Sequence, residues 1–394
     1  MTATTVTPAA SGRAPREPVR ASAGEPSGRL PRSVYRFRLA TVSLGLVALT
    51  FLQDPGRVAS DTKLDLTQNP WGFLTRALHF WDPQGFFGQL QNQAYGYLLP
   101  MGPFFGVGTG LGLPPWVVQR LWWSTLLVAG FLGVVRLTRL LGVERALPRV
   151  VAGLCYVLSA RMLTTLGPIS SETLPMALAP WLLVPLVAGS RSGSTRRAAA
   201  GSASVVALVS GINAVATAAI LPLGLWWLIT REAGPRRRRL MGWWVLAVTL
   251  ASAWFVLPLL LLGRYSPPFL DWIESSSVTT SVTDPDAVLR GVSHWVAYLA
   301  DGAGPLWQSG WTLVTSPVAV LGSAAVAAIG LAGLALPGVR ERRFLVLVLL
   351  TGVVLVGLGH VGDVHGIGAQ TLRDLLDAPL APLRNVHKAQ PLVT

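Results

Sequence analysis

The chain has 394 residues, of which 51% are hydrophobic and only 13% are charged. Soluble proteins carry charge on roughly a quarter of their residues, so this composition excludes a soluble protein and indicates a polytopic membrane protein. The net charge of +14 does not indicate nucleic-acid binding, because the arginines form short clusters between apolar runs. The single cysteine, Cys155, excludes an internal disulfide and a cysteine-based metal cluster.

Residues 1–36 are rich in Ala, Ser, Pro, Gly and Arg, with few large side chains to bury. This composition predicts a disordered, basic, cytoplasmic tail. No A-x-A-like cleavage site follows the first apolar run, so we expect an uncleaved first helix rather than a signal peptide. Residues 37–394 then form one transmembrane domain.

Apolar runs of membrane-spanning length predict an all-α fold, since about 20 apolar residues cross the hydrocarbon core. Residues 97–113 are also apolar, but Pro100 and Pro103, together with the glycines at 106, 108, 110 and 112, favour a re-entrant or interfacial hairpin there. The nine predicted spans are 37–53, 116–135, 150–166, 173–189, 198–212, 214–230, 240–262, 311–336 and 344–360.

The charge distribution fits this topology. If residues 97–113 do not cross, the arginine-rich loops all fall on the side of the N-terminus, which the positive-inside rule places in the cytoplasm. Thirteen of the 18 acidic residues then lie on the opposite side of the cell membrane. They belong to two long extracytoplasmic loops, 54–115 and 263–310, to the outer segment 361–394, and to the turn before the fourth span. We therefore expect the active site to be extracytoplasmic.

An enzyme on that face has no supply of nucleotide sugars or ATP, so a group-transfer reaction there needs a donor already in the membrane, such as a polyprenyl-phosphate sugar. The sequence agrees, because it contains no P-loop and no dinucleotide-binding fingerprint. The glycine-rich run 106–112 does not match that fingerprint, since Leu111 stands in place of the last glycine. These glycines indicate flexible or close-packed backbone.

Five strings carry a family resemblance: DTKLDL (61–66), QNQAYGYL (91–98), QRLWW (119–123), LTTLGPISSE (163–172) and LRNVHK (383–388). In this order they resemble the large actinobacterial α-(1→3)-arabinofuranosyltransferases of the AftD type, in the C superfamily of membrane glycosyltransferases (GT-C). The resemblance covers residues 40 to 388. Family members are much longer, so we expect this chain to be an N-terminal piece, a truncated gene product or a frameshifted remnant.

The resemblance implies a GT-C transmembrane domain that moves arabinofuranose, with inversion, from decaprenyl-phospho-arabinose to the cell-wall arabinan of arabinogalactan and lipoarabinomannan. The implied partners are that lipid-linked donor, the arabinan acceptor and the lipid bilayer. Two alternatives stay open: another GT-C transferase with a lipid-linked donor, for example a mannosyltransferase, and a non-catalytic transporter or assembly scaffold. The later spans contain few polar residues, which disfavours transport.

An inverting transfer needs a base that takes the proton of the acceptor hydroxyl, and the resemblance places a carboxylate for this role in the first outer loop. We favour Asp61, which follows the first span by about eight residues and lies in a matching string; a solvated loop acid is the alternative. Asp54 stands in an Asp-Pro-Gly turn, which suits a turn residue. Asp65 can share the site or cap the following helix.

The leaving group is a polyprenyl phosphate, so cations should meet its negative charge. Arg384, His387 and Lys388 form a compact basic cluster on the predicted outer side, and the planar fork of an arginine suits a phosphate. Lys63 is a further candidate. The alternative for Arg384 is a juxtamembrane contact with lipid headgroups.

The remaining candidate residues are expected to support the site as an ion pair, to bind a metal or to bind the sugar. Arg161 and Glu172 can form a buried ion pair that supports the site, or Arg161 can snorkel from a helix end. A divalent cation (Mg²⁺, Mn²⁺ or Ca²⁺) is a candidate cofactor, with His79 and Asp82 as ligands, although a His beside Phe and Trp also suits the membrane interface. The expected sugar-binding residues, which include aromatic rings suited to stacking, are Trp71, Trp81, Gln91, Asn92, Gln93, Tyr95, Tyr97 and Glu172.

Overall fold

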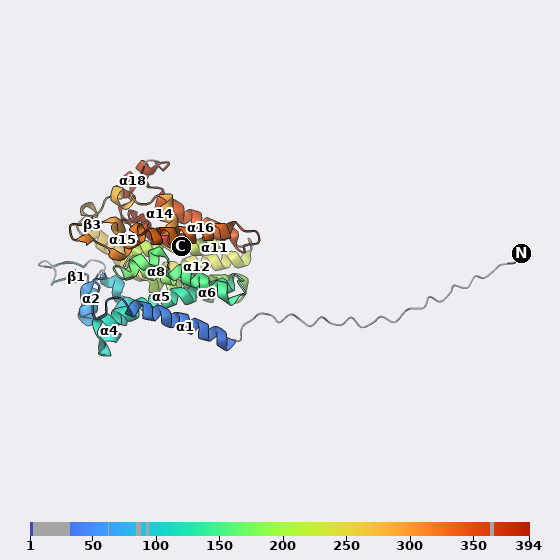
Figure 1. The fold of residues 1–394 in the computed structure, drawn as a ribbon, viewed down its shortest axis with the longest axis horizontal. Coiled ribbons are helices and arrows are strands. Elements are labelled where there is room, and N and C mark those ends of the chain that lie inside the picture. The colour runs from blue at the N-terminus through green and yellow to red at the C-terminus, as the bar shows by residue number, and fades with distance from the viewer. Residues whose placement is uncertain (3–31, 62, 84–87, 92–93, 363–365) are drawn as a thin grey trace.

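The computed structural model describes residues 1–2, 32–61, 63–83, 88–91, 94–362 and 366–394. Nearly all of the predicted tail lies outside these residues, so its predicted disorder is not tested. The described chain is a bundle of helices with two short hairpins, shown in Figure 1. One hairpin pairs β1 (Trp81–Asp82) with β2 (Gln89–Leu90), and the other pairs β3 (Ala300–Asp301) with β4 (Gly304–Pro305).

The α-helices of the described residues are, in chain order, α1 (Arg32–Phe51), α2 (Leu64–Gln68), α3 (Pro70–Ala77), α4 (Met101–Gly110), α5 (Pro115–Leu140), α6 (Ala146–Val157), α7 (Ala160–Leu166), α8 (Ser170–Arg191), α9 (Thr195–Val209), α10 (Ala214–Ala219), α11 (Leu221–Ile229), α12 (Pro235–Tyr265), α13 (Ser276–Thr279), α14 (Pro285–Arg290), α15 (Gln308–Thr315), α16 (Pro317–Ala335), α17 (Arg342–Gly357) and α18 (Ala369–Asp377). Five 3₁₀ helices accompany them: η1 (Ala94–Leu98), η2 (Phe269–Trp272), η3 (Trp295–Tyr298), η4 (Ala381–Leu383) and η5 (Val386–Leu392).

Five helices among the described residues, α1, α5, α8, α12 and α16, are long and apolar enough to cross a membrane. The pair α6 and α7, bent by 49° at its break, would be a sixth span. The count of nine spans therefore stays a prediction. Two boundaries differ from the expected ones. Helix α1 begins at Arg32, inside the segment expected to be disordered, and the span predicted over 311–336 is divided before Pro317, because proline has no N–H with which to continue a helix.

The apolar run 97–113 contains the end of η1 and the ten residues of α4. A helix of that length extends about 15 Å, which is half of the roughly 30 Å hydrocarbon core. The run therefore does not cross the membrane as one helix, and the re-entrant or interfacial hairpin stays a prediction.

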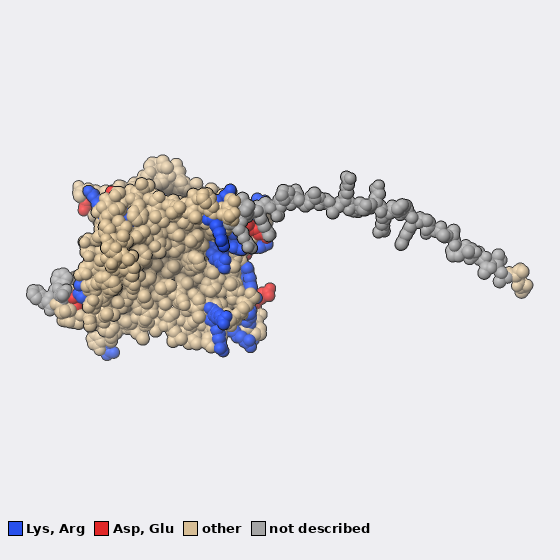
Figure 2. Space-filling model, turned by 90° about the horizontal axis from the view of Figure 1, so that it is seen from below, with Lys and Arg blue, Asp and Glu red and all other residues tan. Residues whose placement is uncertain are grey.

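The arginine-rich loops meet at one end of the bundle. Arg340 donates to the carbonyl of Gly142 (3.4 Å), and Arg231 pairs with Glu341, so the loops that follow α5, α11 and α16 touch one another. Arg236, at the start of α12, donates to two carbonyls at the α8–α9 turn. Figure 2 shows Lys and Arg gathered at one end of the molecule. This arrangement agrees with the single arginine-rich side that the sequence predicts.

Helix α8 forms the centre of the bundle. It packs against α5 and α9, while α5 also packs on α1 and α6, and α9 packs on α12. Two-thirds of its apolar window is buried, whereas α16 has no buried residue and α12 is mostly exposed and apolar, as lipid-facing helices are. The first turn of α8 is the exception to its apolar character, because Ser170, Ser171 and Glu172 are polar and buried. This first turn lies at the end of the bundle opposite to the arginine-rich loops, where the long connecting loops cover it.

Candidate active site

The start of α5 holds the loop that leads to Asp61. The side-chain amide of Gln119 makes two hydrogen bonds with the backbone of Ala59 (2.9 and 2.8 Å). Arg120 donates to the carbonyl of Gln53 through two nitrogens (3.1 and 2.9 Å) and to that of Arg57 (3.2 Å). The QRLWW string thus clamps the segment between α1 and Asp61, which explains why an arginine is stable inside a predicted span.

Asp61 is fully buried against the first residue of α8. Its two carboxylate oxygens accept from the backbone N–H and from the hydroxyl of Ser170, both at 2.6 Å, and Trp122 donates to the same hydroxyl oxygen (2.9 Å). Burial raises the pKa of Asp61 to about 6, although the two hydrogen bonds from Ser170 oppose the rise. The backbone of Asp61 has a φ of +39°, a conformation that costs free energy for a residue other than glycine. The loop is therefore built to place this carboxylate at the start of α8.

Glu172, the third residue of α8, is the centre of a second buried cluster. Arg161 of α7 donates to its Oε2 at 2.6 Å, so the expected ion pair is present. Asn213 donates to the other oxygen (3.2 Å), and Lys388 of η5 approaches it at 3.7 Å. Three segments that are distant in sequence thus converge on one carboxylate.

Two histidines complete this cluster. The Nε2 atoms of His294 and His387 lie 3.8 and 3.6 Å from Oε2 of Glu172. The two rings stack with their centroids 3.9 Å apart, and Trp307 packs edge-on against His294. Burial lowers the pKa of His387 to about 4 and that of His294 well below its usual value. Both imidazoles are therefore neutral at pH 7.

Glu172, His294 and His387 are the one group of at least three described residues with the spacing of metal ligands, their donor atoms lying within 4.8 Å of one another. The hydrogen bonding does not fit a cation. Nδ1 of His294 accepts from the N–H of Val296 (3.3 Å), so the ring proton belongs on Nε2, which then has no lone pair for a metal. Arg161 also already occupies the nearest oxygen of Glu172. The earlier candidates, His79 and Asp82, are not part of this group.

The predicted phosphate ligands divide into two sets. His387 and Lys388 face Glu172, as described above. Arg384 is buried in a different place, where its guanidinium donates to the backbone carbonyls of Leu270 (2.9 Å) and Glu274. Lys63 is half-buried just before α2. A phosphate contact by Arg384 or Lys63 stays a prediction.

The other two candidate bases, Asp54 and Asp65, are exposed. Asp54 lies in the turn after α1, and Asp65 pairs with Arg76 at 2.9 Å with half of its side chain in solvent. Neither is brought to Ser170 or Glu172 by a contact that the structure gives. Asp61 alone among the three is built into the start of α8.

The predicted sugar-binding residues of the first loop lie in different environments. Gln91 cross-links the loop, because its amide bonds to the carbonyls of Ala77 and His79 and to the N–H of Tyr95. Tyr95 is buried, and so is Tyr97, so their rings are already packed. Trp71 and Trp81 are each 55% exposed, and their stacking on a sugar stays a prediction. Asn92 and Gln93 lie outside the described residues.

Sequence analysis missed three residues of the site. Ser170 stands in the string LTTLGPISSE but looks like an ordinary helix-start serine until Asp61 is seen beside it. His294 and Asn213 belong to no string, and their roles follow only from the packing of α10 and of the loop after α14 around Glu172. No local signal in the sequence marks either one.

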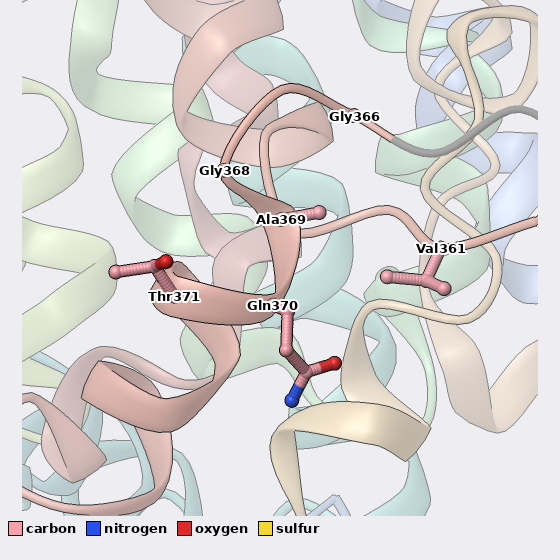
Figure 3. Close-up of a pocket in the computed structure, with 6 residues that line it drawn as sticks. All are labelled: Val361, Gly366, Gly368, Ala369, Gln370 and Thr371. Atoms are coloured by element: carbon pink, nitrogen blue, oxygen red, sulfur yellow. The ribbon is translucent and has the colours of Figure 1, made fainter.

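A surface cavity at the start of α18, with a volume of about 300 Å³, lies apart from these residues. Figure 3 shows the six residues that line this cavity, none of which is ionisable: Val361, Gly366, Gly368, Ala369, Gln370 and Thr371.

Long apolar helices, with buried carboxylates and cations gathered under the loops of one end, define a polytopic membrane protein with a polar site beside the bilayer. The chain belongs to the family described as Alpha-(1->3)-arabinofuranosyltransferase, N-terminal GT-C domain, whose model matches residues 45–394.

The chain is similar to two curated relatives named Alpha-(1->3)-arabinofuranosyltransferase. It is 49% identical over 361 residues to that of Mycobacterium tuberculosis and 48% identical over 356 residues to that of Mycolicibacterium smegmatis. These matches cover 90% and 89% of this chain but 25% of each relative, so the chain spans about a quarter of their length. A cryo-EM structure of arabinofuranosyltransferase AftD from mycobacteria matches with a TM-score of 0.70 and 41% identity, over 91% of this chain and 24% of that one.

Proposed function

We propose that this chain is the membrane part of an enzyme that transfers arabinofuranose from decaprenyl-phospho-arabinose to cell-wall arabinan, with inversion, on the extracytoplasmic face of the cell membrane. The observation that carries the proposal is the hydrogen bonding of Asp61 to Ser170, the first residue of α8, two residues before Glu172 and its cations. Transfer from a phosphate leaving group requires a base and cations, and both contact the first turn of α8.

Asp61 is the proposed base. The acceptor hydroxyl attacks C1 of arabinose, its proton passes to the Asp61 carboxylate, and the bond between C1 and the phosphate oxygen breaks, so that polyprenyl phosphate leaves with the bonding electrons. A pKa of about 6 suits this role, because a base is most effective when its pKa lies near the working pH. Ser170 occupies two of roughly four acceptor positions on the carboxylate, which leaves room for the substrate hydroxyl.

The transferase proposal predicts a specific product. Membranes that contain this chain should move arabinofuranose from radiolabelled decaprenyl-phospho-arabinose to an arabinofuranose oligosaccharide, and linkage analysis should find a new α-(1→3) bond. Decaprenyl-phospho-mannose is the matched control donor, and it should not be consumed. Consumption of mannose instead would favour another GT-C transferase, and transfer from neither donor would overturn the proposal for this chain.

The proposed topology predicts opposite labelling at the two ends of the bundle. In a Cys155→Ser background, a membrane-impermeant maleimide added to intact cells should label Ser281→Cys, an exposed position near α13, and should not label Glu232→Cys, an exposed position among the arginines. Permeabilised cells, in which both variants should react, provide the control. Labelling of the Glu232→Cys variant alone in intact cells would place Asp61 in the cytoplasm.

A further inference from the structure

The cluster around Glu172 contains more hydrogen-bond donors than acceptors. An ionised carboxylate offers about four acceptor positions, and Arg161, Asn213 and Lys388 already approach those of Glu172. Two further nitrogens of Arg161, Nε and Nη1, are buried without a hydrogen-bond partner, and so is Nε1 of Trp307. Donors that are removed from water and left without an acceptor cost free energy, so this arrangement favours a ligand that brings acceptors.

The charges of the cluster are also unequal. Arg161 and Lys388 are cations, Glu172 is the single anion, and the two histidines are neutral at pH 7 because burial lowers the pKa of both. The site therefore carries one net positive charge in a buried place. A ligand with one negative charge would balance it, whereas a divalent cation would raise the charge to about +3, which burial strongly opposes.

One member of the cluster reaches solvent. The side chains of Arg161 and Glu172 are 2% and 3% exposed, whereas that of Lys388 is 15% exposed. Lys388 therefore marks the edge at which a ligand meets the buried arginine. A buried arginine, a partly exposed lysine and neutral imidazoles together provide the hydrogen-bond donors and the charge that bind an oxyanion.

We propose that Arg161, with Lys388 and His387, binds the singly charged phosphodiester of a lipid-linked sugar, and that Glu172 holds these donors in place. The inference rests on the proposed function, which supplies such a donor, and assigns its phosphate to a residue of α7 that the sequence indicated only as an ion-pair partner. Phosphodiester headgroups of bilayer lipids share this chemistry, so the experiment must separate the two sources.

The test measures binding by the full chain in a phosphate-free maltoside detergent, with tryptophan fluorescence as the signal. Decaprenyl-phospho-arabinose should bind at least about tenfold more weakly to Arg161→Lys than to the unchanged chain, because the substitution keeps the charge but loses the fork that makes paired hydrogen bonds. Arg191→Lys, at the opposite end of the bundle, is the matched control and should bind normally. His387→Asn, which removes no charge, should also weaken binding and guards against misfolding of the arginine variant.

Each outcome has a distinct meaning. Equal affinity of the unchanged chain and a folded Arg161→Lys variant overturns the site, and so does binding of phosphatidylglycerol that equals that of the polyprenyl donor in affinity and in dependence on Arg161. Binding of Mn²⁺ or Zn²⁺ that is lost in His294→Gln would show a metal centre instead. If lipid binding depends on Arg161 but no arabinose is transferred, the phosphate site stands and the transferase proposal fails. If arabinose is transferred with the same KM by both proteins, the transferase proposal stands and the site fails.

Discussion

Replacing Asp61 by Asn should reduce arabinose transfer by about 10²- to 10⁴-fold, the range that a positioned general base contributes. The amide has nearly the same shape and can still accept from Ser170, but it cannot take up a proton. The loss should appear in kcat at a normal expression level in membranes. Asp286→Asn, the same change at an exposed outer-loop position, is the control and should transfer at the normal rate.

The pH dependence should follow the same group. Because Asp61 must be ionised to act and its pKa is raised to about 6, transfer should fall as the pH decreases through 6, and not near 4 as for an exposed aspartate. The hydroxyl of Ser170 lowers this pKa, so Ser170→Ala should move the fall to a higher pH. A Ser170→Ala enzyme with an unchanged pH profile, or an Asp61→Asn enzyme with near-normal turnover, would remove Asp61 as the base.

Replacing Glu172 by Gln should lower the free energy of unfolding by about 3–5 kcal/mol, the cost of leaving a buried charge without its partner. The carboxylate receives Arg161 at 2.6 Å and lies near Lys388, so its neutralisation leaves two cations in a buried place with no anion. The change should appear as a large decrease in the melting temperature of the purified chain in detergent.

The pair of Asp286 and Arg290 provides the comparison for stability. Nη1 of Arg290 lies 2.6 Å from Oδ2 of Asp286, as close as the buried pair, but the Asp286 side chain is 64% exposed. Because solvent screens this interaction, Asp286→Asn should change the unfolding free energy by only about 0–1 kcal/mol. If the Glu172 and Asp286 variants melted at the same temperature, the buried pair would not be the element that holds α7 and η5 against α8.

The sequence predicted the membrane class and the family, because these depend on composition and on local strings. It also singled out Asp61 and the LRNVHK string, whose roles in the reaction stay predictions. The placement of Arg384 and Tyr97 could not be predicted in this way. Both lie in strings that match the family, yet one side chain is bound by backbone carbonyls and the other is packed in the core. A string shows that residues matter, but only the packing shows whether they face a substrate.

The same limit applies to Glu172. Its neighbours come from α7, the start of α10, the loop before η3 and η5, and no spacing in the sequence relates these segments. The pairing of Glu172 with Arg161 could be predicted from the sequence because only one short loop separates α7 from α8. The histidine pair was not, since His294 and His387 meet only after two intervening long helices have packed.

The contact between Glu172 and Lys388 has a consequence for biogenesis. The carboxylate enters the bilayer early in synthesis, and the lysine that completes its surroundings is made more than half a chain later. When α8 has been synthesised and inserted, η5, which supplies Lys388 to its acidic first turn, has therefore not yet been made. Until then the nascent protein can be anchored in the membrane without a finished pocket, which separates insertion from the onset of chemistry.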